Sequence, residues 1–80
     1  MSWENYISFD PDVCHGKAHI KGTRVLISVI LDSLAEKITI KELLEQYPSL
    51  KEEDIYAALQ YGAMLAREDI IPIKEQESEI

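Results

Sequence analysis

The sequence predicts a mainly α-helical domain in which a three-helix core follows a short N-terminal β-hairpin. Apolar residues recur at helical spacing in three successive segments after residue 26. Capping residues and a proline separate these segments. The first 25 residues instead carry short apolar runs between turn residues. The 80 residues are enough for one domain, which we expect over residues 1–73, with a disordered acidic tail over residues 74–80.

The N-terminal segment predicts two short strands. Tyr6–Phe9 is aromatic and β-branched, and residues 10–12 (Asp-Pro-Asp) have the composition of a turn. Ala18–Lys21 is the second candidate strand, and Gly22 ends it. Because a two-stranded hairpin is not stable alone, we expect it to pack on the helices.

The first two helices are predicted from apolar spacing and capping residues. The first runs from about Leu26 or Ser28 to Glu36, and Thr39 with Glu42 forms a capping box at the start of the second, which ends before Pro48. The apolar face of the first helix contains Ile27, Ile30, Leu31, Leu34 and Ile38. That of the second contains Ile40, Leu43, Leu44 and Tyr47.

The third helix is predicted to start near Lys51, with a second capping box between Ser49 and Glu52. Gly62 costs about 1 kcal/mol relative to alanine inside a helix, so we expect it to allow close packing against another helix. The tight turn at residues 48–50 makes a helix-turn-helix core compatible with the sequence. The expected buried stripe contains Ile55, Ala58, Leu59, Gly62 and Ala66.

Composition favours a soluble cytoplasmic protein. One cysteine cannot form an internal disulfide, which fits a reducing compartment. No apolar run approaches the roughly 18 residues of a membrane span. The N-terminus lacks the pattern of a signal peptide. We therefore expect no membrane association.

The net charge of −7 is unevenly distributed. Residues 13–41 carry five basic and two acidic side chains, a balance of +3, whereas residues 42–80 carry three basic and ten acidic ones, a balance of −7. A polyanion would be attracted to the first region and repelled by the second.

Two motifs resemble one known family. Residues 10–27 read DPDVCHGKAHIKGTRVLI, and residues 47–59 read YPSLKEEDIYAAL. Both resemble signatures of the family of domain of unknown function 433, small bacterial and archaeal proteins. The resemblance spans roughly Tyr6 to Ile73. Three positions depart from the family pattern: Ala18 and Leu26 replace prolines, and Lys37 replaces a glycine, which removes an easy left-handed helix cap.

The resemblance implies a helix-turn-helix or homeodomain-like fold and the role of a type II antitoxin. Such a protein binds and neutralises a toxin, often a PIN-like ribonuclease, and can repress its own promoter. Two alternatives are open: a DNA-binding regulator without a toxin, and a homo-oligomeric assembly domain. We expect no enzyme activity and no cofactor, and we expect a homodimer or higher homo-oligomer.

Cys14, His15 and His19 are the candidates for metal binding or cysteine–histidine catalysis. His15 and His19 are four residues apart, and on an extended loop this spacing does not bring two side chains to one face. The sequence also offers no second pair of ligands to complete a metal site. Adjacent Cys14 and His15 point apart in an extended chain. We therefore expect neither a metal site nor a catalytic residue.

The candidates for nucleic-acid or phosphate binding surround the Gly22-Thr23-Arg24 motif. Backbone N–H groups, a hydroxyl and a guanidinium could hold a phosphate there. The alternative, which we favour at this stage, is that Arg24 pairs with a carboxylate such as Asp10 and braces the fold. Exposed positions expected on the third helix are Lys51, Glu52, Glu53, Tyr56, Ala57 and Gln60. The full candidate set is Lys17, Lys21, Thr23, Arg24, Lys41 and Gln60.

The acidic C-terminal half is the candidate surface for the toxin. An RNA-cutting enzyme has a positively charged groove, which acidic residues complement. The apolar residues 70–73 could anchor the contact, and a solvated tail that aids solubility is the alternative. The candidate residues are Glu68, Asp69, Ile71 and Ile73.

Overall fold

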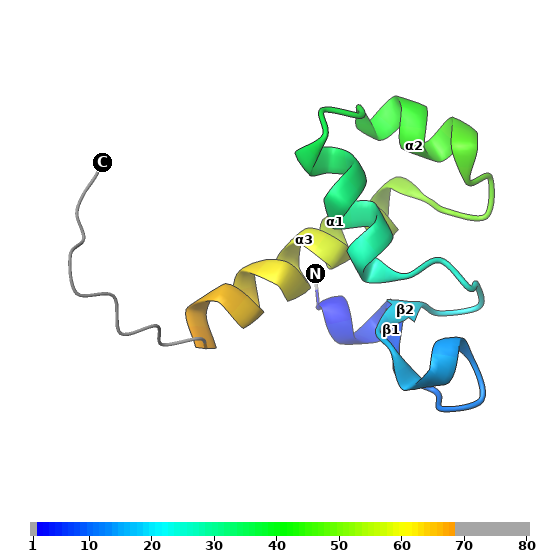
Figure 1. Cartoon of the computed structure of the whole chain (residues 1–80), viewed down its shortest axis with the longest axis vertical. Helices are drawn as coiled ribbons and strands as arrows, with labels where there is room; N and C mark the ends of the chain where they lie inside the picture. Colours follow the sequence, from blue (N-terminus) through cyan, green and yellow to red (C-terminus); the bar gives the residue numbers. More distant parts are fainter. Residues whose placement is uncertain (1, 69–80) are drawn as a thin grey trace.

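The structure is a computed structural model that describes residues 2–68. Three α-helices and a two-stranded antiparallel sheet make up the fold, which confirms the predicted mainly α architecture. Figure 1 shows the elements in order: η1 (Trp3–Asn5), β1 (Ile7–Ser8), η2 (Cys14–Gly16), β2 (His19–Ile20), α1 (Ile27–Ala35), α2 (Ile40–Gln46) and α3 (Glu52–Glu68), where η marks a single 3₁₀ turn.

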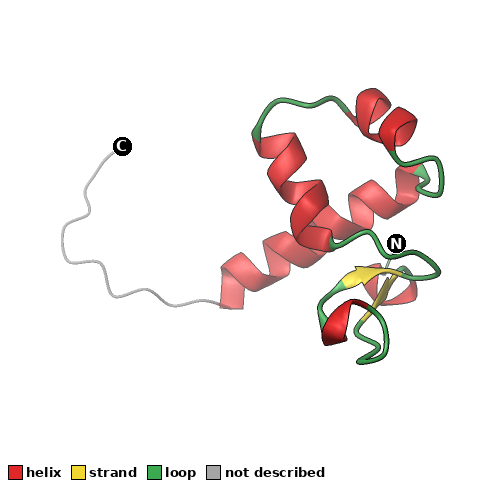
Figure 2. Cartoon of the chain, turned by 45° about the vertical axis from the view of Figure 1, so that its right-hand side comes forward, coloured by secondary structure: helices red, strands yellow, loops and turns green. Residues whose placement is uncertain are grey.

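The two predicted strands form, although each has only two residues. Ile7 lies opposite Ile20, and Ser8 lies opposite His19. His19 also bridges Leu26, which ties the sheet to the start of α1. Figures 1 and 2 show the sheet on one side of α3 and α2 on the other. The loop between the strands contains η2, whose three residues all have positive φ, an unusual conformation for side chains other than glycine.

The sheet packs on the helices, as predicted. Ile7 and Ile20 belong to the core, and an aromatic cluster joins the N-terminal segment to α3. The Trp3 and Tyr61 ring centroids lie 5.0 Å apart in an edge-to-face arrangement. Phe9 lies 5.8 Å from the same ring. The buried core contains Ile7, Ile20, Ile27, Ile30, Leu43, Leu50, Ile55, Ala57 and Ala58.

The end of α1 corrects one expectation. Lys37 follows the helix with a φ of 71°, so the left-handed cap is kept even though the residue is not glycine. The Ile38 N–H donates to the Ser33 carbonyl, and the Lys37 N–H donates to that of Leu34, both at 3.0 Å. These two bonds are those of a Schellman motif. The hydrogen bonds that the last carbonyl groups of the helix accept therefore outweigh the steric cost of a side chain in this conformation.

The predicted capping box at the start of α2 is confirmed. The Thr39 N–H donates to the Glu42 carboxylate at 2.8 Å, and the Glu42 N–H donates to the Thr39 hydroxyl at 3.1 Å. The hydrogen bonds from the Thr39 backbone and side chain hold the pKa of Glu42 below its ordinary value. Leu43 is fully buried, and the rest of the predicted apolar face is half-buried.

The start of α3 differs from the prediction. The helix begins at Glu52, so its N-cap is Lys51 and the capping box between Ser49 and Glu52 was wrong. Asp54, and not Glu52, is the acidic residue that caps the helix start, because its carboxylate accepts the Lys51 N–H at 2.9 Å. The N-cap therefore lies two residues later than predicted, and the acid that bonds it, Asp54, is only 9% exposed.

The buried stripe of α3 was predicted partly wrongly. Ile55 and Ala58 are buried as expected, but Leu59 is 41% exposed and Ala66 is exposed. Ala57 was expected at the surface and is fully buried. The buried face is thus turned toward Asp54, Ala57 and Tyr61, because Tyr61 contacts the N-terminal aromatic residues.

The predicted close packing at Gly62 is confirmed. A Cβ at this position would lie 3.2 Å from Cδ1 of Leu31 on α1. Beyond this crossing, the last turns of α3 extend past the other elements (Figures 1 and 2). In residues 2–68, no helix combines the length and the apolar character that crossing a bilayer requires.

Candidate functional site: a polar groove at the Gly22–Arg24 loop

The loop from β2 to α1 is a tight turn fixed by its own hydrogen bonds. The Thr23 N–H donates to the Ile20 carbonyl at 3.0 Å, and Gly22 has a φ of 78°, as the third residue of a type II turn requires. The Thr23 hydroxyl donates to the Ile20 carbonyl at 2.8 Å and accepts the Val25 N–H at 3.0 Å. Thr23 is therefore occupied in holding the loop, and its hydroxyl proton is not available to a phosphate.

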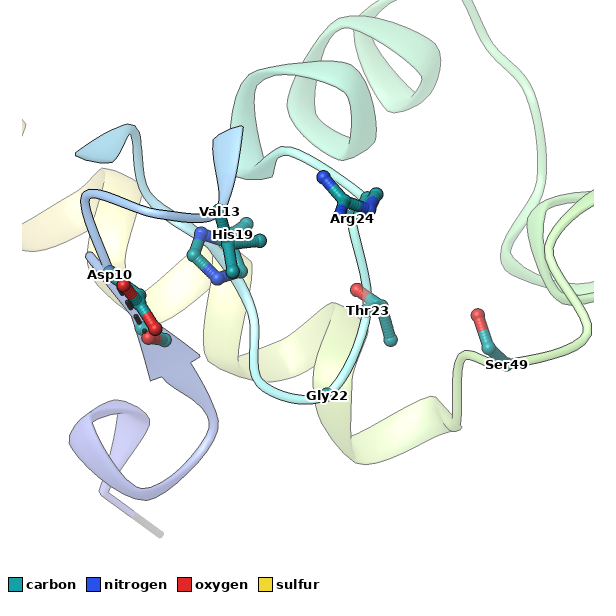
Figure 3. Close-up of a pocket in the computed structure, with 8 residues that line it drawn as sticks. Asp10, Val13, His19, Gly22, Thr23, Arg24 and Ser49 are labelled. Atoms are coloured by element: carbon teal, nitrogen blue, oxygen red, sulfur yellow. Dashed lines mark hydrogen bonds between the residues drawn. The ribbon is translucent and has the colours of Figure 1, made fainter. Parts of the chain in front are cut away.

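Two neighbouring hollows flank this loop, and three residues line both of them. Both are lined by Gly22, Thr23 and Ser49, so the β2–α1 loop and the α2–α3 turn meet between them. We call the two hollows together the loop groove. The larger hollow, of about 570 Å³, is lined by Ser8, Asp10, Val13, His19, Gly22, Thr23, Arg24 and Ser49 (Figure 3). The smaller, of about 320 Å³, is lined by Asn5, Tyr6, Lys21, Gly22, Thr23, Ser49, Lys51 and Asp54.

His19 forms the floor of the larger hollow. The side chain is 2% exposed, and its Nδ1 lies 2.8 Å from the Lys17 carbonyl. Because a carbonyl only accepts hydrogen bonds, Nδ1 carries the hydrogen, and Nε2 of the neutral ring is left as an acceptor. No residue in the described part of the chain bonds this Nε2. Figure 3 places the ring between Asp10 and the Thr23–Arg24 segment.

Three cationic side chains border the loop groove. Arg24 lines the larger hollow, and Lys21 and Lys51 line the smaller one. All three are exposed, and within residues 2–68 none of them forms an ion pair. The favoured alternative for Arg24, an ion pair with Asp10, is therefore not formed, although both residues line the same hollow. The Asp10 carboxylate instead accepts the Asp12 N–H at 2.9 Å.

The groove brings together only half of the predicted nucleic-acid residues. Lys21, Thr23 and Arg24 meet there. Lys17 lies elsewhere, at an apolar hollow beside Leu26 and Leu65. Lys41 is exposed on α2, and Gln60 lies with Trp3 and Arg67 at a different depression.

Sequence reasoning missed Ser49 and Lys51 as neighbours of the Gly22–Arg24 motif. They are more than 20 positions away along the chain, and only the packing of the α2–α3 turn against the loop brings them close. The one sequence signal was that Lys51 is basic and stands directly before the acidic start of α3.

The metal and catalytic candidates do not assemble. His15 is exposed, His19 is buried, and the Cys14 thiol lies 3.5 Å from the Arg24 carbonyl, which it can weakly bond. No three histidine, cysteine, aspartate or glutamate side chains of residues 2–68 are arranged to hold a metal ion.

A second surface feature lies on α3. Tyr56 is 46% exposed and Leu59 is 41% exposed, and Ala63 and Ala66 continue the same face at i+7 and i+10 from Tyr56. We call these four residues the α3 stripe. Glu52 and Glu53 are exposed one turn before it. Of the predicted partner-binding residues, Glu68 is the last residue of α3, whereas Asp69, Ile71 and Ile73 lie outside the described residues, as does the predicted tail.

The chain is similar to one described family and to a solved structure from that family. The family model described as a protein of unknown function, DUF433, matches residues 7–62. The crystal structure at 2.00 Å resolution of a DUF433 member protein from Anabaena variabilis ATCC 29413 is 34% identical and superimposes with a TM-score of 0.73. The match covers 80% of this chain and 63% of the other, so this chain spans less than two thirds of its relative. No curated protein matches the chain.

Proposed function

The chain belongs to the DUF433 family, whose function is unknown, and from this membership we propose that it is a binding protein, the antitoxin of a type II toxin–antitoxin pair. In this proposal it neutralises a ribonuclease of PIN-like type by direct contact. Repression of its own promoter is a second activity, for which the cationic residues of the loop groove are the candidates. The family resemblance motivates the choice of partner, and the α3 stripe supplies the surface.

The observation that carries the proposal is the exposed α3 stripe. Four apolar or aromatic side chains lie along one helix face over about 15 Å, on a helix whose last turns extend past the domain. A helix that presents such a stripe binds by laying it in a groove of a partner. Tyr56 suits the centre of an interface because aromatic side chains contribute much of the binding energy there.

Charge supports a cationic partner. Glu52 and Glu53 are exposed one turn before the stripe, at its N-terminal end. The groove of an RNA-cutting enzyme is positively charged, so the acidic rim would increase the association rate and favour that partner over others. The same acidic residues argue against α3 as the helix that enters a DNA groove, because they would face phosphates.

The test is recovery and inhibition of the toxin. We expect the tagged chain, expressed in its own cells, to recover a small nuclease in near-equal amount, and equimolar chain to abolish the ribonuclease activity of that protein. Leu59→Lys should weaken the inhibition at least about tenfold, because it places a charge in the buried part of the contact.

The matched control is Gln46→Lys, which adds the same charge at an exposed site on α2. It should inhibit like the wild-type chain. A nuclease that keeps full activity with excess chain would overturn the proposal. If Leu59→Lys instead abolishes a homodimer seen by light scattering, with no nuclease recovered, the stripe belongs to an interface between copies and the assembly-domain alternative replaces the antitoxin.

A further inference from the structure

We propose that the loop groove is a binding site for a small phosphorylated ligand that also carries hydrogen-bond donors, a nucleotide being the representative case. The inference goes beyond the antitoxin role and does not depend on it, because the groove and the α3 stripe share no residue. Its basis is that cationic side chains border the groove and that two hydrogen-bond acceptors, Asp10 and His19, line its larger hollow.

The cationic end fits a phosphate. Arg24 borders it from one hollow, and Lys21 and Lys51 border it from the other. The three side chains come from two segments of a chain of net charge −7, and the hollows that they line share Gly22 and Thr23. Charge-assisted bonds from lysine and arginine to phosphate are among the stronger hydrogen bonds in proteins.

Neutral donors complete this end of the site. The N–H groups of Gly22 and Arg24 have no partner within residues 2–68. The space around Gly22 is open, because a Cβ there would meet no atom within 4 Å. A phosphate oxygen can therefore approach the backbone closely. The Ser49 hydroxyl, exposed on the facing turn, likewise bonds no other described residue.

The acceptor end explains why a bare phosphate is not the best ligand. Asp10 places a carboxylate in the larger hollow, and the Nε2 of His19, whose ring is 2% exposed, is bonded by no residue among 2–68. A carboxylate repels an anion, but both groups accept hydrogen bonds from hydroxyl or amino groups. A ribose or a base carries such donors next to its phosphate.

The size of the groove agrees with this class of ligand. The larger hollow alone, at about 570 Å³, lies within the range of about 300–1,000 Å³ that is usual for small-molecule sites. Asp54 also lines the smaller hollow, where its carboxylate accepts the Lys51 N–H. We expect the phosphate at the wall that the two hollows share, near Gly22 and Ser49.

The experiment is a titration of the full ¹⁵N-labelled chain followed by amide NMR shifts. The probes are adenosine 5′-monophosphate, ribose 5-phosphate, adenosine and inorganic phosphate, each to about 10 mM, where a site with a Kd near 1 mM is mostly filled. We expect adenosine 5′-monophosphate and ribose 5-phosphate to shift the amide signals of Gly22, Arg24 and Lys51. Adenosine, which lacks the phosphate, should leave these amides unchanged.

Variants separate the two ends of the groove. Arg24→Gln should weaken the binding of ribose 5-phosphate about tenfold, whereas Lys41→Gln, which removes the same charge from α2, should not. Asp10→Asn should weaken the binding of ribose 5-phosphate, because it removes one acceptor. It should strengthen the binding of inorganic phosphate, because it removes a repulsive charge. This opposite response is not produced by a loss of folding.

A last arm distinguishes the source of the phosphate. If the site serves a nucleic-acid strand, a short oligonucleotide binds more tightly than the mononucleotide, and Arg24→Gln lowers the slope of log K against log salt by about 1. If a free nucleotide is the ligand, the oligonucleotide binds no better. The proposal is overturned if no probe shifts the groove amides, or if Arg24→Gln and Lys41→Gln respond alike. None of these results bears on nuclease inhibition through the α3 stripe.

Discussion

Gly62 of α3 lies directly against Leu31 of α1, so that a Cβ at position 62 would lie 3.2 Å from the Leu31 Cδ1 atom. This distance is shorter than ordinary van der Waals contact, and the atom that would have to move is the end of a flexible side chain that is half-buried. At this crossing of α1 over α3, Leu31 therefore occupies the space that a side chain at position 62 would need.

Gly62→Ala is expected to leave the free energy of unfolding nearly unchanged. The gain in helix propensity of about 1 kcal/mol is offset by the displacement of Leu31. In a Leu31→Ala background the displacement disappears, so the same substitution should stabilise by about 1 kcal/mol. Urea unfolding of the wild type, the two single variants and the double variant gives the coupling free energy between the two sites. Equal effects of Gly62→Ala in both backgrounds would contradict the contact.

Lys37→Gly is expected to stabilise the protein by about 1 kcal/mol, because φ at this position is 71° and glycine adopts it without steric cost. For a domain of this size the gain corresponds to a rise in Tm of about 4–8 °C. Thermal unfolding followed by circular dichroism measures it. Lys41→Gly, at the second residue of α2, is the control and should not raise Tm, since the backbone there is helical and glycine has a low helix propensity.

Stability should depend on the ionisation of Glu42. Its pKa lies below the ordinary value of 4.5 because the Thr39 N–H and hydroxyl bond the charged form. A group with a lowered folded pKa stabilises fully above its unfolded pKa, and the contribution is lost as pH falls through the folded pKa. Glu42→Gln should therefore be less stable than wild type at pH 7, and the difference should shrink in acid. A difference independent of pH would show that the carboxylate charge has no role.

Thr23 and Arg24, although adjacent, are expected to respond differently to substitution. Thr23→Val removes the acceptor of the Val25 N–H and the donor to the Ile20 carbonyl, so it should cost about 1–3 kcal/mol of stability. Arg24→Gln removes an exposed charge without an ion pair in residues 2–68, and it should change stability by less than about 0.5 kcal/mol. Chemical unfolding of both variants tests this. A large loss with Arg24→Gln would make Arg24 an architectural residue.

The helices were predictable because their signals are local. The capping box at Thr39, the proline at position 48 and the apolar face of α1 each act within a few residues, and the structure confirms all three. The face that α3 buries was not predictable in full. Leu59 and Tyr61 are both compatible with a buried helix face, and the choice depends on Trp3 and Phe9, which contact Tyr61 from the other end of the chain.

The sequence by itself determined the order of elements, the helix boundaries to within a few residues and the family, because capping, spacing and turn composition are read along the chain. Only the tertiary structure decided that Lys51 and Ser49 line the same groove as Lys21 and Arg24, and that His19 is buried in the hollow that Asp10 also lines. It also decided that Leu59 is exposed. These outcomes depend on contacts between residues far apart in sequence, and such contacts follow from how the helices and the sheet share one small core.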